Sequence, residues 1–112
     1  MIGIDLVAVH RIEKLSGRAW YTAFWLRPEE FLYLSEKPNA GESLAGAITA
    51  KEAVMKAVGR GFRQGTRPAN ILLEWSPSGA PSATFEGTRY LLSVTHADGY
   101  AAAVALQSGA AA

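Results

Sequence analysis

Residues 44–58, LAGAITAKEAVMKAV, carry the clearest secondary-structure pattern in this sequence. The apolar residues Leu44, Ile48, Met55 and Val58 recur at spacings that place them on one side of a helix with about 3.6 residues per turn. This pattern is typical of a helix that packs one side against the rest of a protein. The segment therefore predicts one long helix with a buried side.

The residues on either side of this segment predict where the helix begins and ends. Ser43 is the predicted N-cap, because a serine side chain can accept a hydrogen bond from a backbone N–H at a helix start. Gly59-Arg60-Gly61 predicts the end, because glycine readily takes the left-handed conformation that helix C-termini favour. Residues 37–41 include Pro, Asn and Gly and predict a loop before the helix.

The N-terminal part predicts a strand followed by a short helix. Residues 1–9 are apolar and partly β-branched, which indicates a buried strand, at its shortest residues 2–7, that carries Asp5 near its end. From Val9 the apolar residues recur every third position, which indicates a helix that Gly17 ends.

A further short helix is predicted where Pro28 is followed by two glutamates, since proline and acids favour the first turn of a helix. Phe31 and Leu34 would face the core from this helix.

The C-terminal part predicts strands joined by turns. We expect strands at residues 71–75, 83–85, 90–95 and 100–106, a turn at 76–81, a hairpin turn at 96–99 and a frayed end at 108–112.

Composition limits the function classes that this chain can have. Its 112 residues predict one domain, residues 1–112, and 49% hydrophobic with 19% charged residues predict a folded core. The absence of cysteine excludes disulfides, a thiol nucleophile and cysteine-based zinc sites. A net charge of +1 indicates no general attraction to nucleic acid. Without a basic leader or an apolar run of about 18 residues, we expect a cytoplasmic protein and no membrane partner.

Asp5 is a candidate for metal binding or catalysis. A carboxylate inside an apolar strand is costly to bury unless it is paired or binds a cation. The alternative is a strand-end acid that caps the following turn.

Glu52 and Lys56 lie four residues apart and therefore on one face of the long helix, with the acid first. The simplest interpretation is a surface ion pair. Glu52 also lies one turn from Ile48 and Met55, so we expect the pair at the edge of the core.

Three further groups could bind anions. Gly59, Arg60 and Gly61 could present N–H groups and a cation to phosphates, or could only end the helix. His96 could donate to a phosphate, or could be an ordinary turn residue. Arg11, Lys14 and Arg18 could form a positive patch on one helical face, or an ordinary solvated surface.

Taken in order, these segments resemble the holo-acyl-carrier-protein synthase family of phosphopantetheinyl transferases. The resemblance spans nearly the whole chain. The matching stretches are Gly3-Ile4-Asp5-Leu6-Val7 with Arg11-Ile12, Leu44-Ala45-Gly46, Ala50-Lys51-Glu52-Ala53 with Lys56, Gly59-x-Gly61, Gly79-x-Pro81, and Ser93-Val94-Thr95-His96 with Tyr100-Ala101-Ala102-Ala103.

The resemblance implies an enzyme that moves the phosphopantetheine group of coenzyme A onto a serine of an acyl carrier protein. It implies that Asp5 and Glu52 ligate Mg²⁺ together with the pyrophosphate, which suits a hard cation that prefers oxygen ligands. Lys56 would share the phosphate charge, and His96 would lie near the nucleotide. The serine's base would be Glu52 or a metal-bound water.

The resemblance also implies that the helix carrying Arg11, Lys14 and Arg18 meets the acidic carrier protein. The expected fold is α+β, an antiparallel sheet wrapped around the helix of residues 44–58. By the same resemblance we expect a homotrimer with active sites between subunits.

Two departures from the family pattern concern the coenzyme's phosphates. Ala47 stands where the family has an arginine, and residues 24–30 lack the family's leading arginine and its threonine. Arg27, Arg60 or Arg63 could compensate. A second interpretation is therefore a catalytically weakened module that binds carrier protein or nucleotide within a larger synthase. A third is an unrelated α+β binding domain.

Overall fold

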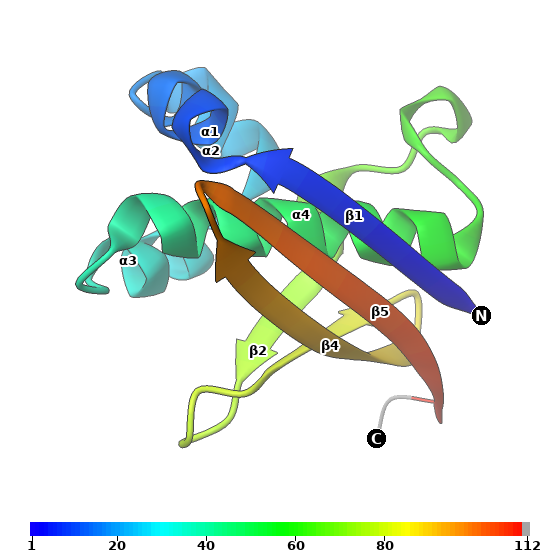
Figure 1. Cartoon of the computed structure of the whole chain (residues 1–112). Helices are drawn as coiled ribbons and strands as arrows, with labels where there is room; N and C mark the ends of the chain where they lie inside the picture. Colours follow the sequence, from blue (N-terminus) through cyan, green and yellow to red (C-terminus); the bar gives the residue numbers. More distant parts are fainter. Residues whose placement is uncertain (111–112) are drawn as a thin grey trace.

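A long helix, α4 (Ala40–Val58), passes behind strands β1 (Ile2–Ala8) and β5 (Tyr100–Ala110) of an antiparallel sheet (Figure 1). The computed structural model describes residues 1–110. Within that range the strands follow the order β1-β5-β4-β3-β2. The remaining strands are β2 (Leu72–Trp75), β3 (Pro81–Phe85) and β4 (Thr88–Ala97).

The ends of α4 bear out one prediction and contradict another. Gly59 ends the helix in the left-handed conformation with φ 83°, as predicted. The helix begins at Ala40, with Asn39 as its N-cap residue, so the prediction of Ser43 as the N-cap is wrong. The loop before the helix is shorter than its composition indicates. The backbone N–H of Ser43 therefore already makes a helical hydrogen bond, to the carbonyl of Asn39 at 3.0 Å.

The hairpin between β4 and β5 is tighter and longer than predicted. Its turn consists of Asp98 and Gly99, with φ of 51° and 79°, the conformation that two-residue hairpins favour. His96 therefore lies in β4 and not in the turn. The predicted frayed end is wrong for residues 108–110, which belong to β5, while residues 111–112 lie outside the described range.

Gly3 brings β1 close to α4. A Cβ atom at this position would lie 2.0 Å from the carbonyl oxygen of Ala53, so any other residue would push the strand away. Side chains alternate along a strand, and Asp5 therefore faces α4 on the same side as Gly3. The close approach of the two backbones places the Asp5 carboxylate against the helix.

Short helices and 3₁₀ turns complete the fold around α4. They are α1 (Val9–Ser16), α2 (Ala19–Trp25), α3 (Pro28–Ser35), and the 3₁₀ turns η1 (Phe62–Gln64) and η2 (Pro68–Asn70). Pro28 begins α3 and Leu34 is buried, as predicted. Phe31 is 38% exposed, so the prediction that it faces the core is wrong.

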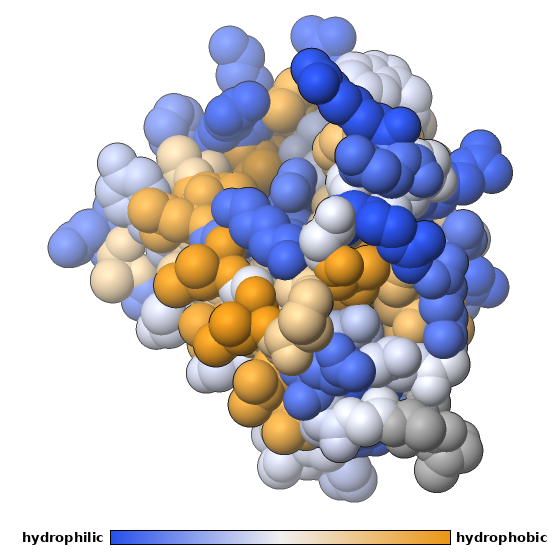
Figure 2. Space-filling model, turned by 90° about the vertical axis from the view of Figure 1, so that its right-hand side faces the viewer, coloured by the Kyte–Doolittle hydropathy of each residue, from blue (hydrophilic) through white to orange (hydrophobic). Residues whose placement is uncertain are grey.

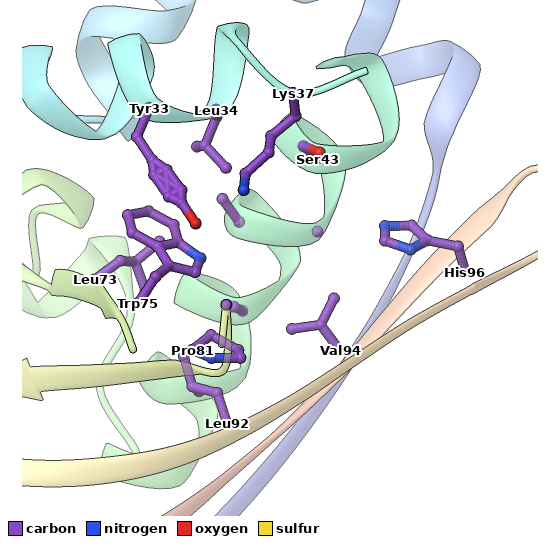
Figure 3. A pocket seen from close by; sticks show the side chains of 14 residues that line it. Tyr33, Leu34, Lys37, Ser43, Leu73, Trp75, Pro81, Leu92, Val94 and His96 are labelled. Atoms are coloured by element: carbon purple, nitrogen blue, oxygen red, sulfur yellow. The ribbon is translucent and has the colours of Figure 1, made fainter. Parts of the chain in front are cut away.

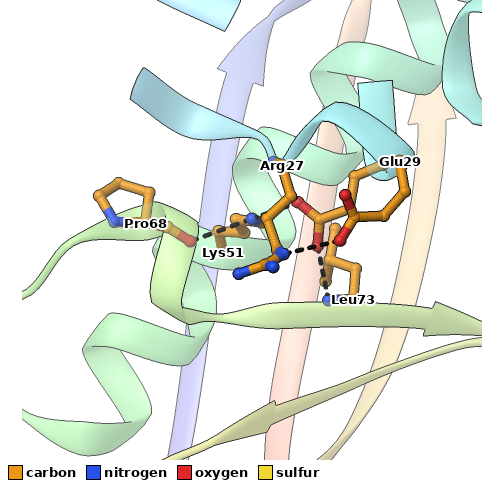
Figure 4. Close-up of polar contacts among 6 residues, drawn as sticks. Arg27, Glu29, Lys51, Pro68 and Leu73 are labelled. Atoms are coloured by element: carbon orange, nitrogen blue, oxygen red, sulfur yellow. Dashed lines mark hydrogen bonds and ion pairs between the residues drawn. The ribbon is translucent and has the colours of Figure 1, made fainter. Parts of the chain in front are cut away.

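Glu30 takes the buried position on α3 because it has a charged partner inside the protein. Its Oε1 atom lies 2.7 Å from Nζ of Lys51, which also donates to the carbonyl of Pro68 (Figure 4). Its Oε2 atom accepts from the backbone N–H of Leu73 at 2.8 Å. One ion pair therefore joins α3, α4, η2 and β2.

Candidate functional site

Asp5 is held by two donors from α4. Thr49 donates its hydroxyl to Oδ2 at 2.5 Å, and Lys56 donates its ammonium to Oδ1 at 3.0 Å. The Asp5 side chain is only 12% exposed, whereas that of Lys56 is 56% exposed. The ion pair predicted from the four-residue spacing of Glu52 and Lys56 is therefore replaced by a pair between Lys56 and the strand.

Glu52 is half-buried beside this pair. Burial raises the pKa of its carboxyl, the negative charge of Asp5 raises it further, and Lys56 lowers it. The charge of Asp5 acts on Glu52 because the fold brings the strand and the helix together. Glu52 and Lys56 line one open pocket of about 220 Å³ with Met55, Gly59, Arg60, Gly61 and Phe62.

The glycines and the arginine after α4 line the same pocket as Glu52 and Lys56. Arg60 is engaged by the carboxylate of Glu86, and its guanidinium lies over the ring of Phe85 at 5.5 Å from the centroid. The predicted residues Glu52, Lys56, Gly59, Arg60 and Gly61 thus share one pocket.

The two carboxylates of Asp5 and Glu52 fit a hard divalent cation only if further oxygen ligands come from a substrate or from water. Among residues 1–110, no group of three or more histidine, aspartate or glutamate side chains could hold a metal by itself. Mg²⁺ commonly binds through one or two carboxylates and completes its shell with phosphates and water. Asp5 and Glu52 are the two carboxylates that could supply that minimum, since the charge of Asp5 acts on Glu52.

His96 lies in a different place. Its Nε2 atom is 2.9 Å from the carbonyl oxygen of Glu42, near the start of α4. It lines a mostly apolar pocket of about 240 Å³ that also includes Ala47 (Figure 3). Gly46 permits this contact, because a Cβ atom there would lie 3.2 Å from Nε2 of His96.

The two pockets flank α4 on opposite sides. Lys56 follows Ala47 by two and a half turns at about 3.6 residues per turn. The strand pairing supports the same separation. Asp5 in β1 and Val94 in β4 both lie opposite Ala103, and Ala103 belongs to β5, the strand between them. Val94 lines the His96 pocket, and so α4 separates that pocket from Asp5 within one chain.

The predicted positive patch is exposed but not on one helix. Arg11 and Lys14 are exposed on α1, whereas Arg18 is the residue before α2. The prediction of a single helical face is wrong for Arg18, because α1 ends at Ser16 and the chain turns at Gly17. The three cations still lie close together in the chain, two on α1 and one at the N-cap of α2.

A family model of the 4′-phosphopantetheinyl transferase superfamily matches residues 1–105. A holo-[acyl-carrier-protein] synthase of Wolinella succinogenes is 40% identical over 114 aligned positions, which cover 93% of each chain. The chain belongs to the holo-[acyl-carrier-protein] synthase family of this superfamily. A synthase of Koribacter versatilis is 36% identical and is matched over 91% of its length.

Solved structures of the family share this fold. The Helicobacter pylori synthase, solved in complex with coenzyme A, has a TM-score of 0.85 and 30% identity over 96% of this chain and 100% of that one. The Bacillus anthracis synthase, in complex with CoA (3′,5′-ADP), has a TM-score of 0.84 and 27% identity over 97% and 96%. The predicted α+β fold and enzyme class are confirmed, and the interpretation as an unrelated binding domain is wrong.

Two parts of the site carry no strong signal in the sequence. Thr49 lies one turn before Glu52, a spacing that could have indicated a shared face. Tyr33 and Lys37, at the end of α3 and just after it, line the His96 pocket together with Trp75 from the distant strand β2. The Tyr33 and Trp75 rings lie 4.2 Å apart, and the Lys37 ammonium is 4.3 Å from the Tyr33 ring centroid. Figure 3 shows Lys37 pointing into this pocket.

Proposed function

We propose that this protein transfers the 4′-phosphopantetheine group from coenzyme A to a serine hydroxyl of an acyl carrier protein. The observation that carries the proposal is the cluster of Asp5, Glu52 and Lys56, two carboxylates and a cation that strand β1 and helix α4 hold together. The names of the related synthases support the same reaction.

The cluster suits phosphoryl chemistry. The serine oxygen attacks the β-phosphorus of the pyrophosphate, and the bond from that phosphorus to the leaving 3′,5′-adenosine bisphosphate breaks. Lys56 is more than half exposed and can offer its positive charge to the phosphate oxygens. When bound by Asp5 and Glu52, Mg²⁺ would neutralise charge on the pyrophosphate.

Glu52 can take the proton of the serine. Burial and the charge of Asp5 raise the pKa of its carboxyl in the absence of a cation, and a water molecule beside it is the alternative base. Thr49 keeps the neighbouring Asp5 in place by occupying Oδ2. Asp5 is therefore fixed by hydrogen bonds beside Glu52.

We also propose that the His96 pocket takes the nucleotide end of coenzyme A. Its apolar lining and its adjoining Tyr33 and Trp75 rings, tilted 41° to each other, suit a planar base, while Lys37 and His96 suit phosphate groups. Arg27, one of the three arginines that could replace the family's arginine, is paired with Glu29 instead. Lys37 is the better candidate, because it lines the same pocket as Ala47.

We propose that the protein assembles as a homotrimer, and the position of the two pockets supports a site shared between subunits. Because α4 separates them within one chain, a coenzyme that uses both would bind Asp5, Glu52 and Lys56 of one subunit and the His96 pocket of another. The outer face of the sheet offers an apolar contact surface. Exposed leucines and isoleucines lie side by side there, namely Ile2, Ile4 and Leu6 of β1, Leu106 of β5 and Leu91 of β4.

Figure 2 shows apolar side chains gathered on the left of that view, over the side of the molecule toward the sheet.

Light scattering after size exclusion should give three times the mass of one chain. Leu6→Lys, which places a charge on this face, should lower that mass and the activity together.

Within residues 1–110, no helix is long and apolar enough to cross a membrane. The cytoplasmic location stays a prediction.

Intact-mass spectrometry tests the reaction. An apo carrier protein incubated with this protein, coenzyme A and Mg²⁺ should gain the mass of one phosphopantetheine group. A carrier whose acceptor serine is replaced by alanine is the matched control, and chelation of Mg²⁺ should stop the reaction. A carrier that stays unmodified at saturating coenzyme A would favour the non-catalytic module, which the synthase relatives do not favour.

A further inference from the structure

Three large aromatic side chains lie exposed on neighbouring elements. Trp20 and Phe24 of α2 are 62% and 49% exposed, and Phe62 of η1 is 49% exposed. We call these three residues the aromatic patch. Side chains of this size are usually buried, and exposed groups of them commonly mark a binding surface.

The aromatic patch is held rigidly from below. Phe24 and Phe62 lie 5.6 Å apart between ring centroids, and both contact the buried Trp25, at 5.7 Å each. Trp20 packs edge-on against the buried Tyr21 at 5.8 Å. Rings fixed in this way lose little conformational entropy on binding, which favours them as anchors of an interface.

The patch adjoins the proposed reaction site. Phe62 lines the same pocket as Glu52 and Lys56. Tyr21 lies on the same short helix as Trp20 and Phe24. Burial raises the pKa of its hydroxyl, the charge of Arg11 lowers it and the charge of Glu52 raises it, so both charged groups act on this helix. A partner that brings a group to Glu52 would therefore meet the aromatic patch.

The charges around the patch select an acidic partner. The surrounding elements carry exposed Arg11, Lys14, Arg18 and Arg63, against one exposed acid, Glu13. A surface with an apolar centre and a positive rim is complementary to a protein whose apolar side chains are flanked by carboxylates.

We infer that the aromatic patch binds apolar side chains that flank the acceptor serine on an acidic carrier protein, so that cations steer the carrier and the rings hold it. This inference rests on the proposed function. It adds Trp20, Phe24 and Phe62 to the carrier-binding surface expected from Arg11, Lys14 and Arg18. The contact that these three rings make with the carrier is apolar, so salt does not screen it.

Steady-state transfer to an apo carrier protein tests the inference with the variants Trp20→Ser and Phe24→Ser. Each should raise KM for the carrier roughly tenfold, as expected for loss of an aromatic anchor, and leave KM for coenzyme A unchanged. Phe24 contacts the buried Trp25, so Phe24→Ser could change KM by loosening the fold. Trp20 makes no such contact with Trp25 among the aromatic pairs of residues 1–110, and Trp20→Ser therefore tests the inference independently. Leu32→Ser is the matched control, because Leu32 is 61% exposed on α3, outside the patch.

Varying the ionic strength distinguishes the contribution of the aromatic rings to carrier binding from that of the cations. The ratio of variant to wild-type KM should stay constant as salt rises, whereas the effect of a charge reversal at Arg11 should shrink. An unchanged KM for the carrier in both serine variants would overturn the inference. So would a loss of oligomeric mass without a change in that KM, since the patch would then be a contact between copies. If wild-type protein transfers nothing, the proposed function fails first, and the patch then binds no acceptor.

Discussion

The ammonium of Lys51 and the carboxylate of Glu30 lie 2.7 Å apart inside the protein, with side chains 0% and 3% exposed. Burial lowers the pKa of Lys51, and the charge of Glu30 opposes that shift. Every oxygen of Glu30 has a donor, since Arg27 and Leu73 also donate their backbone N–H groups to it. Lys51 precedes Glu52, so this pair anchors the turn of α4 that carries the proposed base.

Removal of one member of this pair should destabilise the fold strongly. Lys51→Met leaves the Glu30 charge buried without its cation, which typically costs about 3–5 kcal/mol. Urea unfolding followed by circular dichroism should show this loss. Arg27→Gln is the control, because the pair of Arg27 with Glu29 is exposed and its loss should hardly move the midpoint. Equal midpoints for Lys51→Met and wild type would contradict the prediction.

Asp5→Asn should abolish most transfer without unfolding the protein. The amide keeps the shape of the side chain and can still accept from Thr49, but it loses the charge that pairs with Lys56 and could bind a cation. We expect a fall in kcat/KM of at least about a hundredfold, or roughly 2.7 kcal/mol in transition-state stabilisation. The thermal unfolding midpoint should change little.

Thr49→Val distinguishes the positioning of the Asp5 carboxylate by the Thr49 hydroxyl from the effect of the carboxylate's charge. It removes one donor to Asp5 but leaves both carboxylates and Lys56, so kcat should fall less than in Asp5→Asn. A fall as large as that of Asp5→Asn would mean that the hydroxyl itself contacts the substrate.

The parts of the fold that depend on local pattern could be predicted from the sequence. The periodicity of residues 44–58, the glycine at position 59 and the strand-turn-strand pattern after residue 71 each indicate one structure. Their agreement in order with a known family also indicated that Asp5 and Glu52 lie near each other, and the charge of Asp5 does act on Glu52. These features need no knowledge of distant contacts.

The parts that depend on partners across the fold could not be predicted. Burial of Glu30 in place of Phe31 requires Lys51, which is twenty-one residues away in the chain. Pairing of Lys56 with Asp5 requires the approach of β1 that Gly3 permits. Spacing along one helix reports only local neighbours, so it favoured Glu52 as the partner of Lys56.

Gly3→Ala should disturb both stability and activity, because the new Cβ atom would collide with backbone atoms of α4, 2.0 Å from the Ala53 oxygen and 2.6 Å from the Ala57 nitrogen. Displacement of β1 moves Asp5 away from Thr49 and Lys56. We expect a lower unfolding midpoint and at least tenfold slower transfer at a temperature where the variant is folded.

Gly17→Ala is the matched control for that change. Gly17 has a right-handed backbone conformation, and the nearest atom to a new Cβ there lies 3.9 Å away. Alanine at this position should leave transfer unchanged and leave stability equal or slightly higher. Equal behaviour of both alanine variants would show that β1 does not need the close approach.

Arg11→Glu should weaken carrier binding through charge. Arg11 is exposed on α1, and its reversal replaces attraction of an acidic carrier by repulsion. KM for the carrier should rise at low salt, and the difference from wild type should shrink as the ionic strength rises. Arg89→Glu, an exposed reversal on β4, is the control. A change confined to the affinity for coenzyme A would contradict the assignment of this surface to the carrier.

Ala47→Arg should strengthen coenzyme A binding. Ala47 lines the pocket proposed for the nucleotide, and an arginine there would add a charge-assisted contact typically worth about 1.5–3 kcal/mol, or roughly ten- to a hundredfold in affinity. Lys37→Gln should have the opposite effect, because it removes the cation that already points into the pocket. Calorimetric titration with coenzyme A and Mg²⁺ measures both. If Ala47→Arg binds no better and Lys37→Gln no worse than wild type, the phosphates of the nucleotide lie outside this pocket.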